Sequence, residues 1–375
     1  MRGRVAVALV AVAGLSITLV GQKKQHLNPV VDLLAAGKPV FGTTVPSAGG
    51  GGGGGGNRGG NRGGGVSTAF TPPVAGSGAA AATPAPAAPP APPRTAADAA
   101  KDALAHPEID YFFSGGMEGS VSTPGRNGGP PAIDAFTQIA DAIVEAGGIA
   151  KSPFHYLRAP LSVKTPNISR PDLPADPAKY VDNISRQLNA GVSMISFVEV
   201  DTAEELRQGI AAMRFKAKGG TRPDEIGSAP KYWGLNEKDY RAKADVWPLN
   251  QDGNLLAWAI IESKEGVANI REIAKVKGVS AIIVGAGTMG RVYSTTNPDG
   301  SRGPRDDAAW EAANQTILAA CKEAKVPCGY PAYETDIETR MKQGFSVFII
   351  QAFNERGFKA VEIGRQVSGR DKEKK

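Results

Sequence analysis

Cysteine and histidine are scarce: the 375 residues include two cysteines and three histidines. Cys321 and Cys328 are too few for a disulfide framework, and a structural zinc site needs four ligands. The sequence therefore predicts neither feature. Two buried, unbonded thiols are the preferred interpretation, because free cysteine behaves as a small apolar residue. A bridge between them in an oxidising compartment is the alternative.

No apolar run reaches the roughly 20 residues that a bilayer-spanning helix needs. The stretch from Val5 to Val20 has 16 residues, is interrupted by small and polar ones, and follows the basic start Met1–Arg4. A basic start before a short apolar core is typical of an export signal. Residues 1–22 are predicted to be a signal peptide or, as second choice, an uncleaved membrane anchor. The protein is expected to be exported to the periplasm or outside the cell, and a cytoplasmic location is the alternative.

The part of the chain able to fold lacks an excess of positive charge. The formal net charge is +6, but residues 1–97 carry eight Lys or Arg and one Asp, so the rest is close to neutral. A nucleic-acid-binding fold carries its basic patch on itself, and we therefore expect no nucleic-acid partner. Arg58 and Arg62 resemble an RNA-binding Arg-Gly segment, but a flexible spacer is the preferred interpretation.

Residues 48–97 lack the apolar side chains that a core requires. Eight consecutive glycines, Gly49–Gly56, precede an Ala/Pro-rich run. Such sequence buries too little apolar surface to offset its ordering entropy. It is predicted to be a disordered insertion between residues 23–47, the first helix and strand of the fold, and residues 98–367, the remainder. Residues 368–375 form a charged tail.

Strand-like and helix-like segments alternate in the remainder. Helical signals include the capping box Thr202-Ala-Glu-Glu205, and a long polar loop is predicted between Met213 and Leu255. Eight strands that alternate with helices indicate parallel pairing. A (β/α)8 TIM barrel is the predicted fold, and an open doubly wound sheet is the alternative. The strands are predicted at residues 39–45, 109–113, 155–159, 193–200, 255–262, 280–284, 326–330 and 345–350.

Catalytic groups of such a barrel stand at the carboxyl ends of its strands. Three charged candidates hold that place: Glu118 after the second strand, Arg158 at the end of the third and Glu262 at the end of the fifth. The turn Gly285–Gly290 follows the sixth. A charge at the end of an apolar strand is costly unless it is paired or ligating. A structural ion pair is the alternative for Glu262 and for Arg158.

The same turn matches the dinucleotide fingerprint, with Gly285, Gly287 and Gly290 in place. That motif requires a helix to open at once and point its N-terminus at the pyrophosphate. Residues 291–300 contain Pro298 and Gly300 and lack helical periodicity. A loop is predicted there, and no dinucleotide cofactor is expected.

Four stretches match, in order, those of one enzyme family: residues 28–42, Leu-Arg158-Ala-Pro, residues 188–205, and residues 261–285 with Ile-Glu262-Ser-Lys-Glu-Gly. From Asn28 to about Arg365 the chain resembles the HpcH/HpaI-type aldolase/citrate lyase family, the class II pyruvate aldolases. The resemblance implies a (β/α)8 barrel and a divalent metal, Mg or Mn. It also implies carbon–carbon bond chemistry through a pyruvate-type enolate. A homo-oligomer, with the helix from Glu355 as a contact, is expected as well.

The resemblance also assigns roles to residues. It places the metal-binding Glu at Glu262 and the enolate-stabilising Arg at Arg158. The family's second metal ligand, an Asp, falls on Thr288, a weaker oxygen donor. Substrate is expected to bind along the same turn, at Gly285, Ala286 and Gly287.

The acid/base His of the family falls on Gly119, whereas the Glu beside it is kept as Glu118. Glu118 is therefore the candidate base, or the group that orders metal-bound water. His26, His106 and His155 offer no obvious replacement, and a lost proton shuttle typically costs about 10²–10⁴ in rate.

The predicted function is a metal-dependent carbon–carbon lyase that acts on 2-oxo acids, with an aldehyde as the second small-molecule partner. Contact with a membrane is expected only through the N-terminal segment. The alternative is an exported binding protein on a barrel that has lost its chemistry, which Thr288 and Gly119 favour. A third hypothesis is a metal-free reaction with Glu118 and Glu262 as acid and base.

Overall fold

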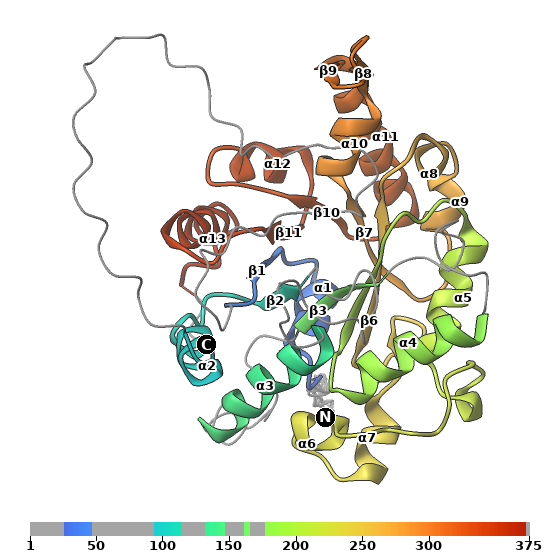
Figure 1. The fold of residues 1–375 in the computed structure, drawn as a ribbon, viewed down its shortest axis with the longest axis vertical. Coiled ribbons are helices and arrows are strands. Elements are labelled where there is room, and N and C mark those ends of the chain that lie inside the picture. The colour runs from blue at the N-terminus through green and yellow to red at the C-terminus, as the bar shows by residue number, and fades with distance from the viewer. Residues whose placement is uncertain (1–25, 47–93, 115–131, 147–160, 166–176, 373–375) are drawn as a thin grey trace, which may run out of the picture.

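The computed structural model describes residues 26–46, 94–114, 132–146, 161–165 and 177–372. Parallel strands lie at the centre and helices surround them (Figure 1). None of the helices within these ranges is long and apolar enough to cross a membrane. The predicted export signal and nearly all of the predicted insertion lie outside the described residues.

Eight strands pair in a closed cycle. β1 (Val40–Thr44), β2 (Tyr111–Ser114), β3 (Leu161–Thr165) and β4 (Met194–Phe197) follow in order. β4 then pairs with β6 (Leu255–Ile261), and the cycle continues through β7 (Val279–Val284) and β10 (Cys328–Pro331) to β11 (Val347–Ile350). β11 returns to β1, and every pairing in the cycle is parallel. The predicted parallel α/β sheet is confirmed.

Helices cover the outside of this sheet. The capping box predicted at Thr202 begins α5, and a second one, formed by Thr95 and Asp98, begins α2. A short strand, β5 (Val246–Trp247), lies beside β6. The outer helices are α2 (Ala96–Ala105), α3 (Ala132–Glu145), α4 (Pro177–Asn189), α5 (Ala203–Met213), α8 (Lys264–Ala268), α9 (Ile270–Ala274), α11 (Asp307–Ala324), α12 (Ile337–Gln343) and α13 (Glu355–Val367).

The sheet separates two apolar cores. One lies between the strands and the outer helices. The other fills the barrel, where α1 (Pro29–Ala35) contributes Val30, Val31 and Leu34. Tyr111 and Trp258 meet edge-on inside the barrel, with ring centroids 5.1 Å apart. The interior is therefore packed with side chains and is not a channel, which leaves the strand ends as the places for polar groups.

The third strand was predicted in the wrong place. The prediction put it at residues 155–159, which lie outside the described part of the chain, whereas β3 runs over Leu161–Thr165 and pairs Leu161 with Phe112. Pro160 lacks an N–H and cannot donate to a ladder, so a strand that begins after it keeps all its donors. Arg158 therefore precedes β3 and does not end it.

The long polar loop predicted after Met213 is also wrong. The segment contains a 3-10 turn (Lys216–Lys218), α6 (Ala229–Trp233) and α7 (Glu237–Lys243). Its helices are fixed by buried aromatic side chains: Trp233 and Tyr240 meet edge-on with ring centroids 5.0 Å apart. Burial of a few large side chains thus stabilises helices in a segment whose polar composition predicted a loop.

The two cysteines form a disulfide, so the preferred interpretation of two unbonded thiols was wrong. Cys321 near the end of α11 and Cys328 at the start of β10 have Cα atoms 5.7 Å apart, within the usual range for a bridge. Both side chains are buried. The bridge ties an outer helix to the sheet.

Candidate functional site

Glu262 lies at the carboxyl end of β6 and faces the inside of the barrel. Leu256, Trp258 and Ile260 of this strand point into the interior core. Side chains alternate along a strand, so Glu262 continues the inward row. Only 5% of the residue is exposed. The sequence-predicted position of this carboxylate, at the mouth of the barrel, is what the structure shows.

Gly285 directly follows β7 and lies against Glu262. Its N–H donates to the carbonyl of Ile261 over 2.9 Å. A Cβ at this position would lie 2.2 Å from Cγ of Glu262 and 2.8 Å from its Oε1. No side chain fits there, so glycine is required for the close approach. The structure thus brings together two of the residues that the sequence singled out.

Ala286, Gly287 and Thr288 form the first turn of a helix, α10 (Ala286–Val292), which begins immediately after Gly285. The loop predicted for residues 291–300 is therefore wrong at Arg291 and Val292, which end this helix. Met289 of the helix is buried, and the indole N–H of Trp310 donates to the carbonyl of Ala286 over 3.3 Å. Those contacts hold a seven-residue helix that sequence periodicity could not show.

A two-stranded hairpin follows α10. It consists of β8 (Ser294–Thr296) and β9 (Arg302–Arg305), and it carries Pro298 and Gly300 in its turn. Figure 1 shows it projecting at one end of the molecule, opposite α6 and α7. The hairpin marks the carboxyl side of the barrel, because it is reached from the end of β7.

Thr288 is held by a cationic neighbour. Nη2 of Arg291 donates to its Oγ1 over 3.0 Å. A guanidinium this close opposes the approach of another cation to the same oxygen. The position that the resemblance gives to a second metal ligand is thus occupied by a hydroxyl that already accepts from an arginine.

The loop after β4 lies beside the loop after β6. Ser263 donates its hydroxyl hydrogen to Oδ1 of Asp201, and its Oγ accepts the N–H of Gly266 over 2.9 Å. Burial raises the pKa of Asp201, and the hydrogen bond from Ser263 opposes that rise. Sequence analysis missed this pair. The available signals were the position of Ser263 next to Glu262 and that of Asp201 next to the capping box.

Several predicted residues have no described surroundings. Glu118, Gly119, Arg158 and His155 lie outside the residues that the structure describes. The other two histidines contact residues other than Glu262. His26 bonds Asp32 at the barrel's amino end over 2.7 Å, and His106 stacks on the ring of Phe358 with centroids 3.9 Å apart. Neither supplies the missing acid/base group at Glu262.

Within the described ranges, no group of three or more His, Cys, Asp or Glu side chains is arranged to hold a metal ion. Of the residues that the structure describes, few could therefore bind a cation together with Glu262. Mg²⁺ binds in this way in many enzymes, through one or two carboxylates together with substrate oxygens and water.

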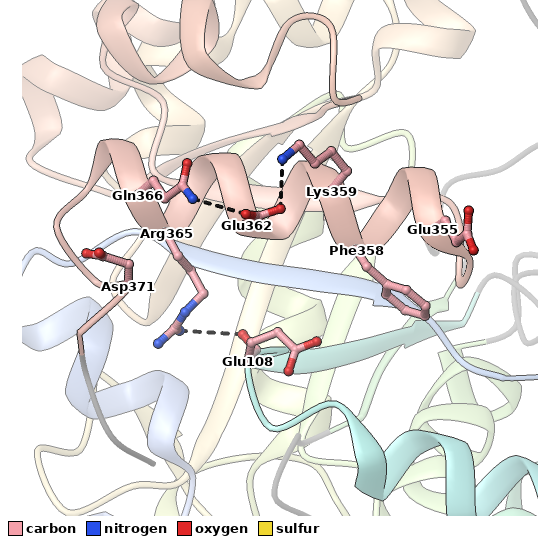
Figure 2. Close-up of a pocket in the computed structure, with 8 residues that line it drawn as sticks. All are labelled: Glu108, Glu355, Phe358, Lys359, Glu362, Arg365, Gln366 and Asp371. Atoms are coloured by element: carbon pink, nitrogen blue, oxygen red, sulfur yellow. Dashed lines mark hydrogen bonds and ion pairs between the residues drawn. The ribbon is translucent and has the colours of Figure 1, made fainter.

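A separate cavity of about 480 Å³ lies on the outer face of α13. Figure 2 shows Phe358 at one end of it and the ion pair of Lys359 and Glu362, 2.9 Å apart, along the helix. Arg365 on its wall donates to the carbonyl of Glu108 over 3.5 Å. The cavity contains none of the predicted site residues.

Residues 173–347 match the model of the HpcH/HpaI aldolase/citrate lyase family. The chain contains an HpcH/HpaI aldolase/citrate lyase family domain. The match includes Glu262, the turn from Gly285 and Thr288. It does not extend to Glu118 or Arg158. The resemblance noted from the sequence is therefore confirmed for the half of the barrel that carries Glu262.

Two curated relatives show low sequence identity to this chain. The chain is 26% identical over 172 residues to a 5-keto-4-deoxy-D-glucarate aldolase of Klebsiella pneumoniae subsp. pneumoniae, and 27% identical over 172 residues to one of Salmonella arizonae. Each match covers 43% of this chain and 57% of the relative. This chain therefore spans little more than half the length of these two enzymes.

Solved structures share the fold. An HpcH/HpaI aldolase/citrate lyase family protein from Burkholderia cenocepacia superposes with a TM-score of 0.53 at 17% identity, over 90% of this chain and 97% of the other. An HpcH/HpaI aldolase from Desulfitobacterium hafniense gives 0.51 at 15% identity, over 85% and 88%. At such identities these likenesses concern architecture alone.

Proposed function

We propose that this protein is a metal-dependent carbon–carbon lyase of the aldolase type, acting on 2-oxo acids through a pyruvate-like enolate. The observation that carries the proposal is the buried carboxylate of Glu262, which faces inward at the mouth of the barrel and lies against the backbone of Gly285. The family domain and the aldolase relatives give the reaction class.

Glu262 is the residue that would hold the cation, with Thr288 as a weak second donor. An oxygen donor in a buried setting fits a hard cation such as Mg²⁺ or Mn²⁺ better than zinc, which favours nitrogen and sulfur. Bound there, the cation would supply Lewis-acid polarisation of the 2-oxo group.

The remaining roles fall to the protein's own groups. The substrate's carboxylate would bind along the turn of Gly285, Ala286 and Gly287. Arg158 would donate hydrogen bonds to the oxygen on which enolate charge develops, and donors placed in this way are typically worth about 10²–10³ in rate. Glu118 would take the proton from the methyl carbon of pyruvate. The aldehyde released or taken up is the second partner.

The test is exchange of pyruvate methyl protons for deuterium with added Mn²⁺, followed by NMR. Loss of an outer-shell partner of a metal ligand commonly costs 10–100-fold, so Glu262→Gln should lower the exchange rate by about 100-fold or more. Glu265→Gln, on the exposed surface of α8, is the matched control and should leave it unchanged. Exchange by Glu262→Gln at the wild-type rate would sink the proposal.

A second candidate, an exported binding protein on the same barrel, is favoured by the Arg291–Thr288 hydrogen bond. That bond places the positively charged guanidinium of Arg291 at the residue where a second metal ligand is expected. The two functions separate in a thermal unfolding series, because a ligand that binds only the folded state raises Tm. Stabilisation by a 2-oxo acid alone, with no further gain from Mn²⁺, would favour the binding protein.

Export is a further part of the proposal. A buried disulfide between Cys321 and Cys328 fits an oxidising compartment, because cytosolic thiols are kept reduced. Cell fractionation with and without residues 1–22 tests it. Retention of the full chain in the cytosol, with two free thiols by mass spectrometry, would contradict export. A homo-oligomer with α13 at the contact is proposed alongside, and sedimentation velocity would measure it.

A further inference from the structure

The turn that carries Glu262 is fastened on both sides. On one side Gly285 N–H bonds the carbonyl of Ile261 over 2.9 Å, which fixes the turn to β7. On the other side, Val200 N–H donates to the carbonyl of Ile260 over 3.1 Å and continues the pairing of β4 with β6. Beyond that point the backbone pairing with β4 ends, and Glu262 lies two residues past Ile260.

Past the last backbone hydrogen bond between β4 and β6, a side-chain hydrogen bond between Asp201 and Ser263 connects the two loops. The hydroxyl of Ser263, the residue directly after Glu262, bonds Asp201 and also caps α8 through Gly266 N–H. Asn269 donates from its side chain to the carbonyl of Asp201 over 2.9 Å. Two side chains from the β6 side, those of Ser263 and Asn269, thus bond one residue of the β4 side.

The backbone of Asp201 is fixed by a hydrogen bond to α5. Its N–H donates to Oε2 of Glu205 over 2.8 Å, and Glu205 belongs to the capping box of α5. The approach of the two loops is close, because a Cβ at Gly266 would lie 2.7 Å from the carbonyl oxygen of Val200 and 3.3 Å from Oδ1 of Asp201. Helices α5 and α8 begin side by side as a result, and Figure 1 shows them on the same flank of the barrel.

We propose that Asp201 is a positioning residue, which acts through Ser263 to hold the Glu262 turn in the conformation that binds a divalent cation. The inference deepens the proposed function and rests on it. Outer-shell hydrogen bonds fix the orientation of a ligand before the cation arrives, so that no ordering cost is left for binding. Asp201 and Ser263 together do this for the turn that carries the carboxylate of Glu262.

The first test needs no metal. Hydrogen–deuterium exchange is measured on the metal-free full chain, in the peptide that contains Glu262 through Gly266. Asp201→Ala and Ser263→Ala should raise the exchange rate there by about tenfold or more, because local opening sets that rate. Asp201→Asn keeps an acceptor oxygen and Ser263→Thr keeps the hydroxyl, so both should remain near the wild type.

The matched control is Asn354→Ala. Asn354 caps α13 by accepting the N–H of Gly357, three residues on, just as Ser263 accepts that of Gly266, but it follows β11 and does not touch the Glu262 turn. Losing either cap should cost about 1 kcal/mol of stability. Only the variants at Asp201 and Ser263 should loosen the peptide from Glu262 to Gly266.

The second test is direct titration with Mn²⁺ followed by electron paramagnetic resonance. Asp201→Ala should weaken Mn²⁺ binding by about 10–100-fold, and Asn354→Ala should not. Wild-type exchange and wild-type Mn²⁺ affinity in Asp201→Ala would overturn the inference. If the wild-type protein binds no Mn²⁺ while Asp201→Ala still loosens the turn, the positioning contact stands and the proposed metal function fails.

Discussion

At the amino end of the barrel, the buried carboxylate of Asp110 lies among arginines, and at the carboxyl end the buried side chain of Glu262 packs against the backbone of Gly285. Asp110, 1% exposed, accepts from both terminal nitrogens of Arg370 over 2.7 and 3.0 Å and lies 3.8 Å from Arg365. It also accepts the N–H of Phe41 over 2.9 Å. Its charge is fully engaged within the protein.

The difference separates a charge cluster that holds the fold from a turn that is shaped around one carboxylate. The amino end is closed by α1, where Asn28 bonds Asn254 over 3.2 Å and apolar side chains fill the barrel above it. The carboxyl end keeps a glycine turn where a side chain would have displaced Glu262. A (β/α)8 barrel is expected to differ in this way, with residues at the amino end of the strands serving stability and residues at the carboxyl end serving chemistry.

The largest effect is expected from Asp110→Ala. It would leave the guanidinium groups of Arg370 and Arg365 buried without their carboxylate, which typically costs about 3–5 kcal/mol. Urea unfolding measures the loss. Asp110→Leu combined with Arg370→Met removes both charges of the main pair and should cost less than Asp110→Ala alone. If Asp110 serves stability alone, the fraction of Asp110→Ala that folds should bind Mn²⁺ with the wild-type affinity.

The disulfide should have the next largest effect. It joins residues seven apart in sequence, and closing so short a loop in the unfolded chain accounts for about 2–3 kcal/mol of stability. Because Cys321 and Cys328 lie at the amino end of β10, the double variant Cys321→Ala, Cys328→Ala should lose stability and keep its Mn²⁺ affinity. An altered affinity would show that the two ends are not independent.

Gly285→Ala is the corresponding change at the carboxyl end. The new methyl group would overlap Cγ of Glu262, and overpacking of this kind costs about 1–3 kcal/mol. The side chain of Glu262 must move, so Mn²⁺ affinity should fall together with stability. In the background of Glu262→Ala the overlap disappears, and the stability cost of Gly285→Ala should shrink by at least about 0.5 kcal/mol in a double-mutant cycle. Additive costs would contradict the close contact.

Local patterns were enough to predict the parts of the fold with strong periodicity. The continuous apolar run of β6 ends in Glu262 and that of β7 ends in Gly285, so parallel pairing alone places the two together. The capping box at Thr202 fixes the start of α5 for the same local reason. The inward direction of Glu262 follows from alternation once the strand is known.

Other parts depend on partners far away in sequence. Helix α10 is stabilised by burial of Met289 and by Trp310, which a seven-residue window does not contain. Asp201 and Ser263 are 62 residues apart, and only the pairing of β4 with β6 brings them into contact. The state of Cys321 and Cys328 depends on the distance between a helix end and a strand start. Local sequence patterns do not contain information on these contacts, because each depends on the distance between separate elements of the fold.

The smallest expected effect is a dependence of stability on pH at the amino end. Asp245 is 2% exposed and accepts from Nε and Nη2 of Arg214 over 2.7 and 3.2 Å. Burial by itself would raise the pKa of Asp245, but the hydrogen bonds from Arg214, Asn250 and the N–H of Val246 outweigh it and the pKa is lowered. The folded protein therefore holds this proton less tightly than the unfolded chain does.

A lowered folded pKa gives stability that is fully present above the unfolded value of about 3.9 and is lost as the pH falls through the folded value. Asp245→Asn should accordingly cost about 1–3 kcal/mol at pH 6, the worth of hydrogen bonds to a charged group, and less at pH 2, where more of the wild-type carboxyl is protonated. Urea unfolding of both proteins at the two pH values measures the change. A constant difference would mean that Arg214 holds the shape of this loop and not the charge of Asp245. The amino end would then owe its stability to packing, and the comparison with the carboxyl end would rest on Asp110 alone.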